Sequence, residues 1–207
     1  MNILVLFAHP ALEKSRVNKR LADAVRTLPG LIFHDLYEAY PDFDIDVPRE
    51  QALLSAHDLI VVQHPFYWYS TPALIKQWED LVLEHGWAYG REGKALHGKY
   101  WLSAITTGGG ESAYNGETEG RVPIRQLLSP LQQTAQLCGM MFLPPFIVHG
   151  THRLDAPAIE TAAADYRRTL EAFRDHRVNL SGLGSLSRLN VDLDTIITPA
   201  ETDGHAR

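Results

Sequence analysis

Short apolar runs alternate with segments of helical periodicity along this chain of 207 residues. Residues 2–8 (NILVLFA) form an almost unbroken apolar run, which is typical of a strand that is buried on both faces. Comparable runs at residues 31–37, 58–63, 99–106 and 140–149 predict further strands, and two prolines interrupt the last of these runs. The pattern therefore predicts a sheet of five strands.

Between the predicted strands, apolar residues recur at intervals of three and four, which predicts helices. Ser15 is a good N-cap residue for the first helix, and Pro29-Gly30 ends it. After the third strand, Thr71 is expected to cap a helix that has Pro72 in its first position.

Three more helical segments follow from the same periodicity. Residues 48–56 favour a short helix, and residues 129–138 a longer one, preceded by a helical turn that Pro130 breaks. Asp155 is expected to cap the last helix.

Strands that alternate with helices indicate an α/β domain, with a parallel sheet and helices on both faces. Five strands favour the doubly wound order 2-1-3-4-5, in which a ligand binds at the switch point between the first and third strands. We expect this domain to span residues 1–176. Residues 177–207 are rich in Ser, Gly and Asp and are expected to form a loose polar tail.

Composition changes this picture mainly by exclusion. The formal charge of -6, without a cluster of Lys or Arg, disfavours nucleic acid as a partner. The one cysteine, Cys138, excludes an intramolecular disulfide and is typical of a reducing compartment. No signal-peptide pattern follows Met1, and no apolar stretch approaches the roughly 20 residues of a membrane helix. We therefore expect a cytoplasmic protein.

The loop after the first predicted strand is a candidate anion site. Ser15 to Asn18 opens a helix, where free backbone N–H groups and the helix dipole favour a phosphate. A plain N-cap would explain the same residues, so this motif acquires meaning only together with others.

Two more loops are expected at the same edge of the sheet. Phe66, Tyr67, Trp68 and Tyr69 follow the third strand and are suited to stacking on a flat ring, although packing would also explain them. The small residues from Thr106 to Gly110 follow the fourth strand and let the backbone approach a ligand. A phosphate in the first loop and a ring between the other two have the shape of flavin mononucleotide (FMN).

Other motifs are absent or have simpler explanations. The chain lacks G-x-G-x-x-G in a first βα turn, the phosphate loop G-x-x-x-x-G-K-[ST], and the esterase elbow G-x-S-x-G. His149 and His152 have an H-x-x-H spacing without a carboxylate partner, so we expect no metal site. Cys138 is expected to be a buried structural thiol.

Several segments, in order, resemble one family over residues 2–173. The segments are FAHP with Ser15-x-x-Asn18, YPDFDID, HPFYWYSTPALIKQW, HGWAYG, ALHGK, TTGGGES and LPPF. They resemble the flavodoxin-like NAD(P)H:quinone oxidoreductases, and especially the ancillary flavoprotein subunits of glutathione-regulated potassium-efflux (Kef) systems. The resemblance implies a flavodoxin-like fold and a homodimer that carries FMN rather than FAD. It also implies reduction of quinones by NADPH or NADH in a ping-pong sequence, and binding to a potassium/proton antiporter at the inner face of the membrane.

The resemblance also implies residue roles. The flavin contacts it implies are His9, Ser15, Arg16, Val17, Asn18, Phe66, Tyr67, Trp68, Tyr69, Thr106, Thr107, Gly108 and Gly109. Tyr114 matches a tyrosine that handles the hydride acceptor in related quinone reductases, and is expected to donate a hydrogen bond or proton. Gly120 stands where those enzymes have a histidine.

Two other functions fit the same residues. One is a redox-sensing module without its own catalytic role, which would activate an ion transporter through the acidic loop at residues 40–47 and the tail. The other is a flavodoxin-type electron carrier, which has no site for a hydride donor. The long loop around Tyr114 and residues 87–89 disfavour the carrier, because a carrier needs no covered substrate pocket.

Overall fold

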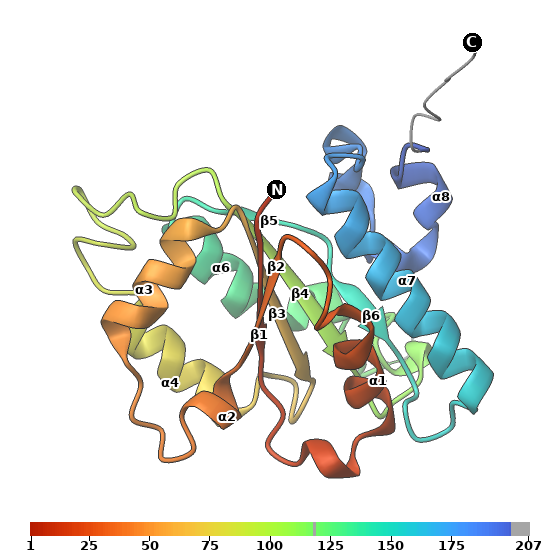
Figure 1. The fold of residues 1–207 in the computed structure, drawn as a ribbon. Coiled ribbons are helices and arrows are strands. Elements are labelled where there is room, and N and C mark those ends of the chain that lie inside the picture. Colours follow the sequence, from red (N-terminus) through yellow and green to blue (C-terminus); the bar gives the residue numbers. More distant parts are fainter. Residues whose placement is uncertain (118, 200–207) are drawn as a thin grey trace.

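The computed structural model describes residues 1–117 and 119–199, in which strands and helices alternate as predicted (Figure 1). The strands are β1 (Ile3–Phe7), β2 (Leu31–Asp35), β3 (Leu59–Pro65), β4 (Tyr100–Thr106), β5 (Met141–Phe142) and β6 (Phe146–Val148). The α-helices are α1 (Arg16–Val25), α2 (Leu36–Ala39), α3 (Val47–Ala56), α4 (Ala73–Val82), α5 (Ile124–Leu127), α6 (Ser129–Leu137), α7 (Ala156–Arg174) and α8 (Leu193–Ile196). Short 3₁₀ segments are η1 (Leu12–Lys14), η2 (Glu111–Ala113), η3 (Leu180–Ser185) and η4 (Leu189–Val191).

The sheet is parallel and has the order β2-β1-β3-β4-β5, which confirms the predicted topology. The predicted fifth strand is divided, because β5 and β6 both pair with β4 but stand apart in the chain. Pro144 and Pro145 lie between them, and proline has no N–H to donate to a ladder.

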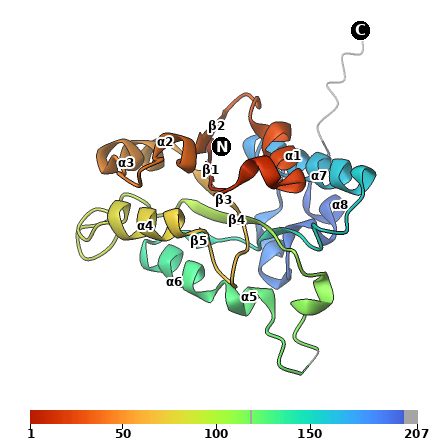
Figure 2. The ribbon, with the colours of Figure 1, turned by 90° about the horizontal axis from the view of Figure 1, so that it is seen from below.

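Helices cover both faces of the sheet (Figures 1 and 2), and the strands supply a separate core to each. Ile3, Val5 and Phe7 belong to the core beneath α1 and α7. Leu4 and Leu6 belong to the core beneath α3, α4 and α6. Successive strand residues point to opposite faces, so a strand that is buried on both sides appears as a continuous apolar run.

Side-chain caps explain where several helices begin. Ser15 Oγ accepts a hydrogen bond from the amide of Asn18 at 3.2 Å, and Asp155 caps α7 in the same way, so both predicted caps are confirmed. The prediction for Thr71 is wrong, because α4 starts after Pro72 and has no side-chain cap. The end of the predicted second strand turns into α2, because the Asp35 carboxylate accepts from the first amides of that helix.

The C-terminal segment, residues 177–199, is not the loose tail that its composition suggests. Leu183, Leu189, Leu193 and Ile196 are buried in the core beneath α1 and α7. A bridge between Val178 and Ile197 closes the segment on itself. The apolar residues are too irregularly spaced to be recognised as a helix or strand. Residues 200–207 of the predicted tail lie outside the described residues.

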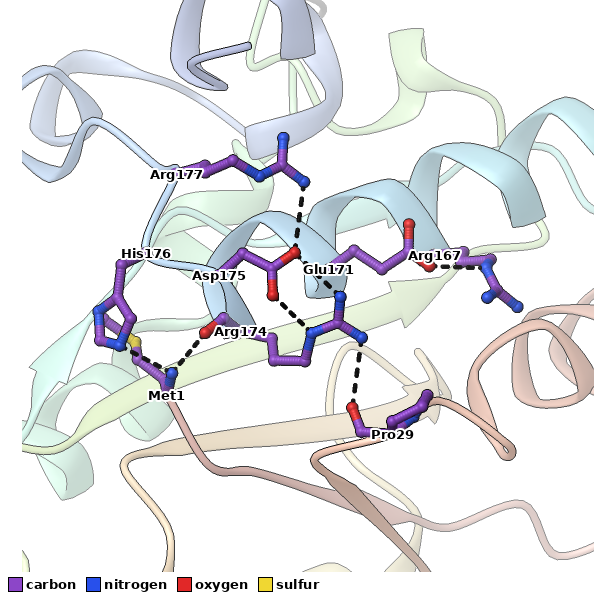
Figure 3. A network of polar contacts seen from close by, with 8 residues as sticks. All are labelled: Met1, Pro29, Arg167, Glu171, Arg174, Asp175, His176 and Arg177. Atoms are coloured by element: carbon purple, nitrogen blue, oxygen red, sulfur yellow. Dashed lines mark hydrogen bonds and ion pairs between the residues drawn. The ribbon is translucent and has the colours of Figure 1, made fainter. Parts of the chain in front are cut away.

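A polar network fixes the point where this segment leaves α7 (Figure 3). The N-terminal ammonium of Met1 donates to the carbonyl of Arg174 at 2.6 Å and lies 3.0 Å from His176 Nε2. The Arg174 guanidinium pairs with Asp175 at 2.7 Å and also donates to the Pro29 carbonyl at 3.3 Å. The start of the chain and the β2 edge are thereby joined to the end of α7.

Candidate functional site

A cavity of about 660 Å³ lies where β1, β3 and β4 deliver their carboxyl ends, at the switch point of the sheet. Three loops that the sequence singles out converge on it. Its lining residues are His9, Ala11, Lys14, Ser15, Arg16, Val17, Asn18, Pro65, Phe66, Tyr67, Trp68, Thr106, Gly108, Gly109, Tyr114, Thr151 and His152. Of the residues expected in the site, Tyr69 and Thr107 do not line the cavity.

The N-terminus of α1 forms one end of the cavity. The amides of Arg16 and Val17 precede the first hydrogen bond within the helix, and both residues line the cavity. The positive end of the helix dipole and the nearby Lys14 add favourable potential for an anion. The Arg16 guanidinium is anchored on the carbonyl of Leu154 at 2.9 Å.

Asn18 joins this helix to the end of β4. Its Nδ2 donates to Thr106 Oγ1 at 2.7 Å, and the residue is only 2% exposed. Its Oδ1 has no hydrogen-bond partner among the residues that the structure describes. A buried acceptor without a partner costs free energy, so a ligand that donates a hydrogen bond here would stabilise the site.

His9 presents a donor to the same cavity. Its Nδ1 accepts from the amide of Ala11 at 3.2 Å, which leaves the proton of the neutral ring on Nε2. Burial lowers the pKa of His9, so the neutral form is favoured near pH 7. His9 packs edge-on against Tyr67, with 6.1 Å between ring centroids.

The aromatic loop after β3 is a tight turn. Tyr67 and Ser70 exchange backbone hydrogen bonds of 3.1 and 2.9 Å, and the two residues between them have φ values of 48° and 65°. This is the geometry of a type I′ turn, which normally uses Asn and Gly, so Trp68 and Tyr69 are held there at a conformational cost. The turn separates the four aromatics: Phe66 is buried, and Trp68 is 94% exposed.

The loop after β4 brings backbone close to the cavity. A Cβ atom at Gly108 would lie 2.7 Å from Nε2 of His152, so a side chain there would displace the His152 ring from its present position. The amides of Gly108 and Gly109 donate to no acceptor within the described part of the chain, which leaves two donors for a ligand. Thr107 is 1% exposed, and its hydroxyl donates to the carbonyl of Gly109 at 2.8 Å, so its role is to hold the loop.

Tyr114 forms the far wall of the cavity. Its ring stacks on His149 with a centroid distance of 5.7 Å and packs edge-on against Phe66. Burial raises the pKa of Tyr114, so the phenol stays protonated and can donate. Gly120 offers no side chain, and the histidine that meets Tyr114 is instead His149, whose Nδ1 lies 3.0 Å from Thr107 Oγ1.

Some lining residues were not predicted from the sequence. Thr151 and His152 reach the cavity from the loop after β6, which pairs with β4. The H-x-x-H spacing singles out His152 but does not indicate that it lines this cavity. Residues 1–117 and 119–199 contain no group of three or more His, Cys, Asp or Glu side chains placed to hold a metal ion together. Within these residues, no helix has the length and apolarity that crossing a bilayer requires.

Comparison with known proteins agrees with the topology of the sheet. The family described as "Flavodoxin-like fold" matches residues 1–170. The chain belongs to this flavodoxin-like family. A curated relative, the glutathione-regulated potassium-efflux system ancillary protein KefF of Enterobacter sp. (strain 638), is 48% identical over 169 residues. That match covers 81% of this chain and 94% of the relative.

Similar solved structures carry several names. General stress protein 14 of Treponema denticola, in complex with FMN, has a TM-score of 0.76 and 37% identity and covers 83% of this chain and 99% of its own. An NADPH-quinone reductase from P. pentosaceus has a TM-score of 0.74 and 31% identity, and the match covers 82% of this chain and 97% of the reductase. A structure described as a thermophilic tryptophan halogenase from Streptomycin violaceusniger has a TM-score of 0.78 and 42% identity. That match covers 81% of this chain and 97% of the other.

Proposed function

We propose that this protein is an FMN-dependent NAD(P)H:quinone oxidoreductase. The observation that carries the proposal is the cavity at the switch point, where a helix N-terminus, an aromatic turn and a glycine loop converge. When bound, FMN supplies the redox chemistry, taking a hydride from the reduced nicotinamide and delivering two electrons to a quinone that also takes up protons. The names of a relative solved with FMN and of a quinone reductase support this choice.

The residues of the cavity fit FMN group by group. The amides of Arg16 and Val17 and the dipole of α1 suit a phosphate. The free acceptor Oδ1 of Asn18 suits a ribityl hydroxyl, which can donate to it. The amides of Gly108 and Gly109 suit the electron-rich edge of a flavin ring.

Tyr114 is the residue to which we assign a role in quinone reduction. Its phenol stays protonated, lines the cavity and can donate a hydrogen bond or proton to the quinone oxygen. Because one cavity would serve both the nicotinamide and the quinone, we expect the two substrates to use it in turn, which is a ping-pong sequence.

Purification and assay test the proposal directly. The protein is expected to purify yellow, with a visible flavin absorption band, and thin-layer chromatography is expected to identify FMN rather than FAD. A soluble quinone should sustain NADPH or NADH oxidation, with parallel double-reciprocal plots. Flavin binding without NAD(P)H consumption would instead support an electron carrier.

The variant Tyr114→Phe tests the assigned role. It should lower kcat for quinone reduction by about tenfold or more, because proton transfer by a positioned side chain typically contributes at least that much. FMN content measured by absorbance should be unchanged. Turnover equal to that of the unsubstituted protein would remove Tyr114 from the mechanism.

A second function is favoured by the KefF relative, which is named as an ancillary protein of a potassium-efflux system. We propose that this chain also binds a potassium/proton antiporter as a homodimer at the cytoplasmic membrane face. Co-purification with a Kef-type antiporter from the same cells, together with measured potassium efflux, tests this function. Efflux that is the same with and without the protein would contradict it.

One similar structure is described as a tryptophan halogenase, but we expect no halogenase activity from this protein. Incubation of the FMN-loaded protein with tryptophan, NADH, oxygen and bromide should give no brominated product by mass spectrometry. A halogenated indole would contradict this expectation and show a second activity.

A further inference from the structure

The C-terminal segment builds a second, smaller cavity beside Tyr114. This cavity of about 170 Å³ is bounded by residues of the Tyr114 loop and α5, by His149 after β6, and by Ser187 and Arg188 of the segment. The match to the flavodoxin-like family ends at residue 170, so Ser187 and Arg188 come from outside the matched region. Tyr114 lines both cavities, so the small one lies on the other side of this ring from the candidate FMN site.

Specific contacts hold the segment in this position. The Arg188 guanidinium makes a two-pronged pair with Glu111, whose second contact, from Nη2 to Oε2, measures 3.2 Å. The side-chain amide of Asn190 exchanges two hydrogen bonds with the backbone of Ile147, at 3.0 and 2.8 Å. The amide of Leu189 donates to the carbonyl of Pro145 at 2.9 Å. The segment is thus registered against β6 and against the loop that carries Tyr114.

The charges that face this cavity do not balance. Two guanidinium groups, those of Arg125 and Arg188, meet one carboxylate, that of Glu111. Arg188 and Glu111 neutralise each other, whereas Arg125 forms no ion pair with any described residue. The Nη1 atom of Arg125 is buried and has no hydrogen-bond partner among the described residues. A buried cationic donor without an acceptor is unfavourable, and an oxyanion would supply the missing acceptor.

We propose that Arg125 and Arg188 form an oxyanion subsite that binds the carboxylate or phosphate group of a substrate whose ring lies in the candidate FMN site. The small cavity has room for such a group rather than for a whole cofactor. The source of the oxyanion is either the phosphate of the nicotinamide donor or an acidic group on the quinone. The inference rests on the proposed function for its substrate and on the observed cavity for its chemistry.

Direct binding to the FMN-loaded protein is the first test. Inorganic phosphate and benzoate are titrated by calorimetry into the unsubstituted protein and into Arg125→Gln and Arg188→Gln. Each variant should bind at least one of these anions about tenfold more weakly, a loss of about 1.4 kcal/mol. Arg49→Gln, which removes an exposed charge from α3, is the matched control and should leave binding unchanged.

The variant Glu111→Gln separates binding from structure. It removes the same ion pair as Arg188→Gln but leaves both guanidinium groups, so anion binding should be maintained or become tighter. If the pair serves only to fix the segment, Glu111→Gln and Arg188→Gln should weaken binding equally, and that result would overturn the proposal.

Steady-state kinetics identify the source of the oxyanion. If it is the nicotinamide phosphate, both arginine variants should raise KM for NADPH about tenfold, with KM for NADH changed by less than about twofold. If it belongs to the acceptor, the same contrast should appear between a naphthoquinone carboxylate and the parent naphthoquinone. Unchanged KM ratios together with unchanged phosphate and benzoate affinities would refute the subsite. Absence of turnover in the unsubstituted protein would refute the proposed function alone, because the titrations would still test the subsite.

Discussion

Single residues in this protein carry charges whose cost depends on pH, and Glu79 on α4 is the clearest example. Burial raises the pKa of Glu79 to about 7, and its Oε1 has no partner among the described residues. The folded-state pKa lies above the ordinary value of 4.5, so the carboxyl destabilises the protein as pH rises through this window, and most strongly above pH 7.

Glu79→Gln should therefore increase the free energy of unfolding more at pH 8 than at pH 5, by a difference of about 2 kcal/mol. Urea unfolding of both proteins at pH 5 and pH 8 measures this difference in the free energy of unfolding. Glu92→Gln, whose side chain is 83% exposed, is the control and should show no such difference. An equal effect of Glu79→Gln at both pH values would show that another group provides a charge partner for Glu79.

Ser15 has two expected roles, as the cap of α1 and as part of the candidate phosphate site. Ser15→Ala should lower the free energy of unfolding by about 1 kcal/mol and also weaken FMN binding. Asp46→Ala removes the side-chain cap of α3, which does not line the cavity, and should cost similar stability without changing FMN affinity. Thermal unfolding and fluorescence titration measure the two effects. Equal FMN affinity in both variants would exclude Ser15 from the site.

At the scale of elements, a buried carboxylate holds three helices against the sheet. Glu50 of α3 accepts from His34 of β2 at 2.8 Å, from Tyr40 after α2 at 2.5 Å and from Trp78 of α4 at 2.8 Å. Burial alone would raise the pKa of Glu50, but these three donors outweigh it and hold the pKa below 4.5. A depressed carboxyl pKa stabilises the fold above the unfolded value and ceases to do so as pH falls through the folded one.

Glu50→Gln should lower the free energy of unfolding at pH 7 by about 1–3 kcal/mol, because a charge-assisted acceptor is lost. The penalty should shrink as pH falls below 4.5, where the unsubstituted protein loses its own advantage. Glu38→Gln, on the exposed side of α2, is expected to be neutral. Denaturant unfolding between pH 3 and pH 7 measures both, and a penalty that is constant over this range would contradict the assignment.

The elements were predictable where burial imposes a pattern. β1, β3 and β4 are buried on both faces, so their apolar runs stand out, and the order of the sheet follows from the alternation of elements. The start of α2 depends instead on hydrogen bonds that the Asp35 carboxylate accepts from two backbone amides, and α4 begins without the cap that Thr71 was expected to supply. Such ends are decided by a single side-chain orientation, which a sequence pattern does not contain.

The candidate site was predictable to the extent that it is built from loops that follow strands. Ser15, Asn18 and Gly108 lie together because parallel strands deliver their loops to one edge. The contact of Tyr114 with His149 and the place of His152 depend on the pairing of β6 with β4, which joins residues distant in sequence. Tyr69 does not line the cavity, because the type I′ turn points consecutive aromatic side chains in different directions.

The whole molecule is larger than the part that matches its family. Residues 177–199 bury apolar side chains in the core beneath α1 and α7 and reach the loop that carries Tyr114 through Arg188. A segment with these contacts contributes to folding and to the candidate site together. Its stability contribution can be measured separately from its charge by changing an apolar residue that lies away from both cavities.

Leu189 is that residue, since it is fully buried and contacts the core rather than either cavity. Leu189→Ala should lower the free energy of unfolding by about 2–4 kcal/mol, through lost burial and the cavity that remains. Val191→Ala, in the same short segment but 54% exposed, should change it by less than about 0.5 kcal/mol. Urea unfolding followed by tryptophan fluorescence measures both. Equal stability of the two variants would show that the segment does not pack on the domain in solution, and would also remove the physical support for the Arg188 subsite.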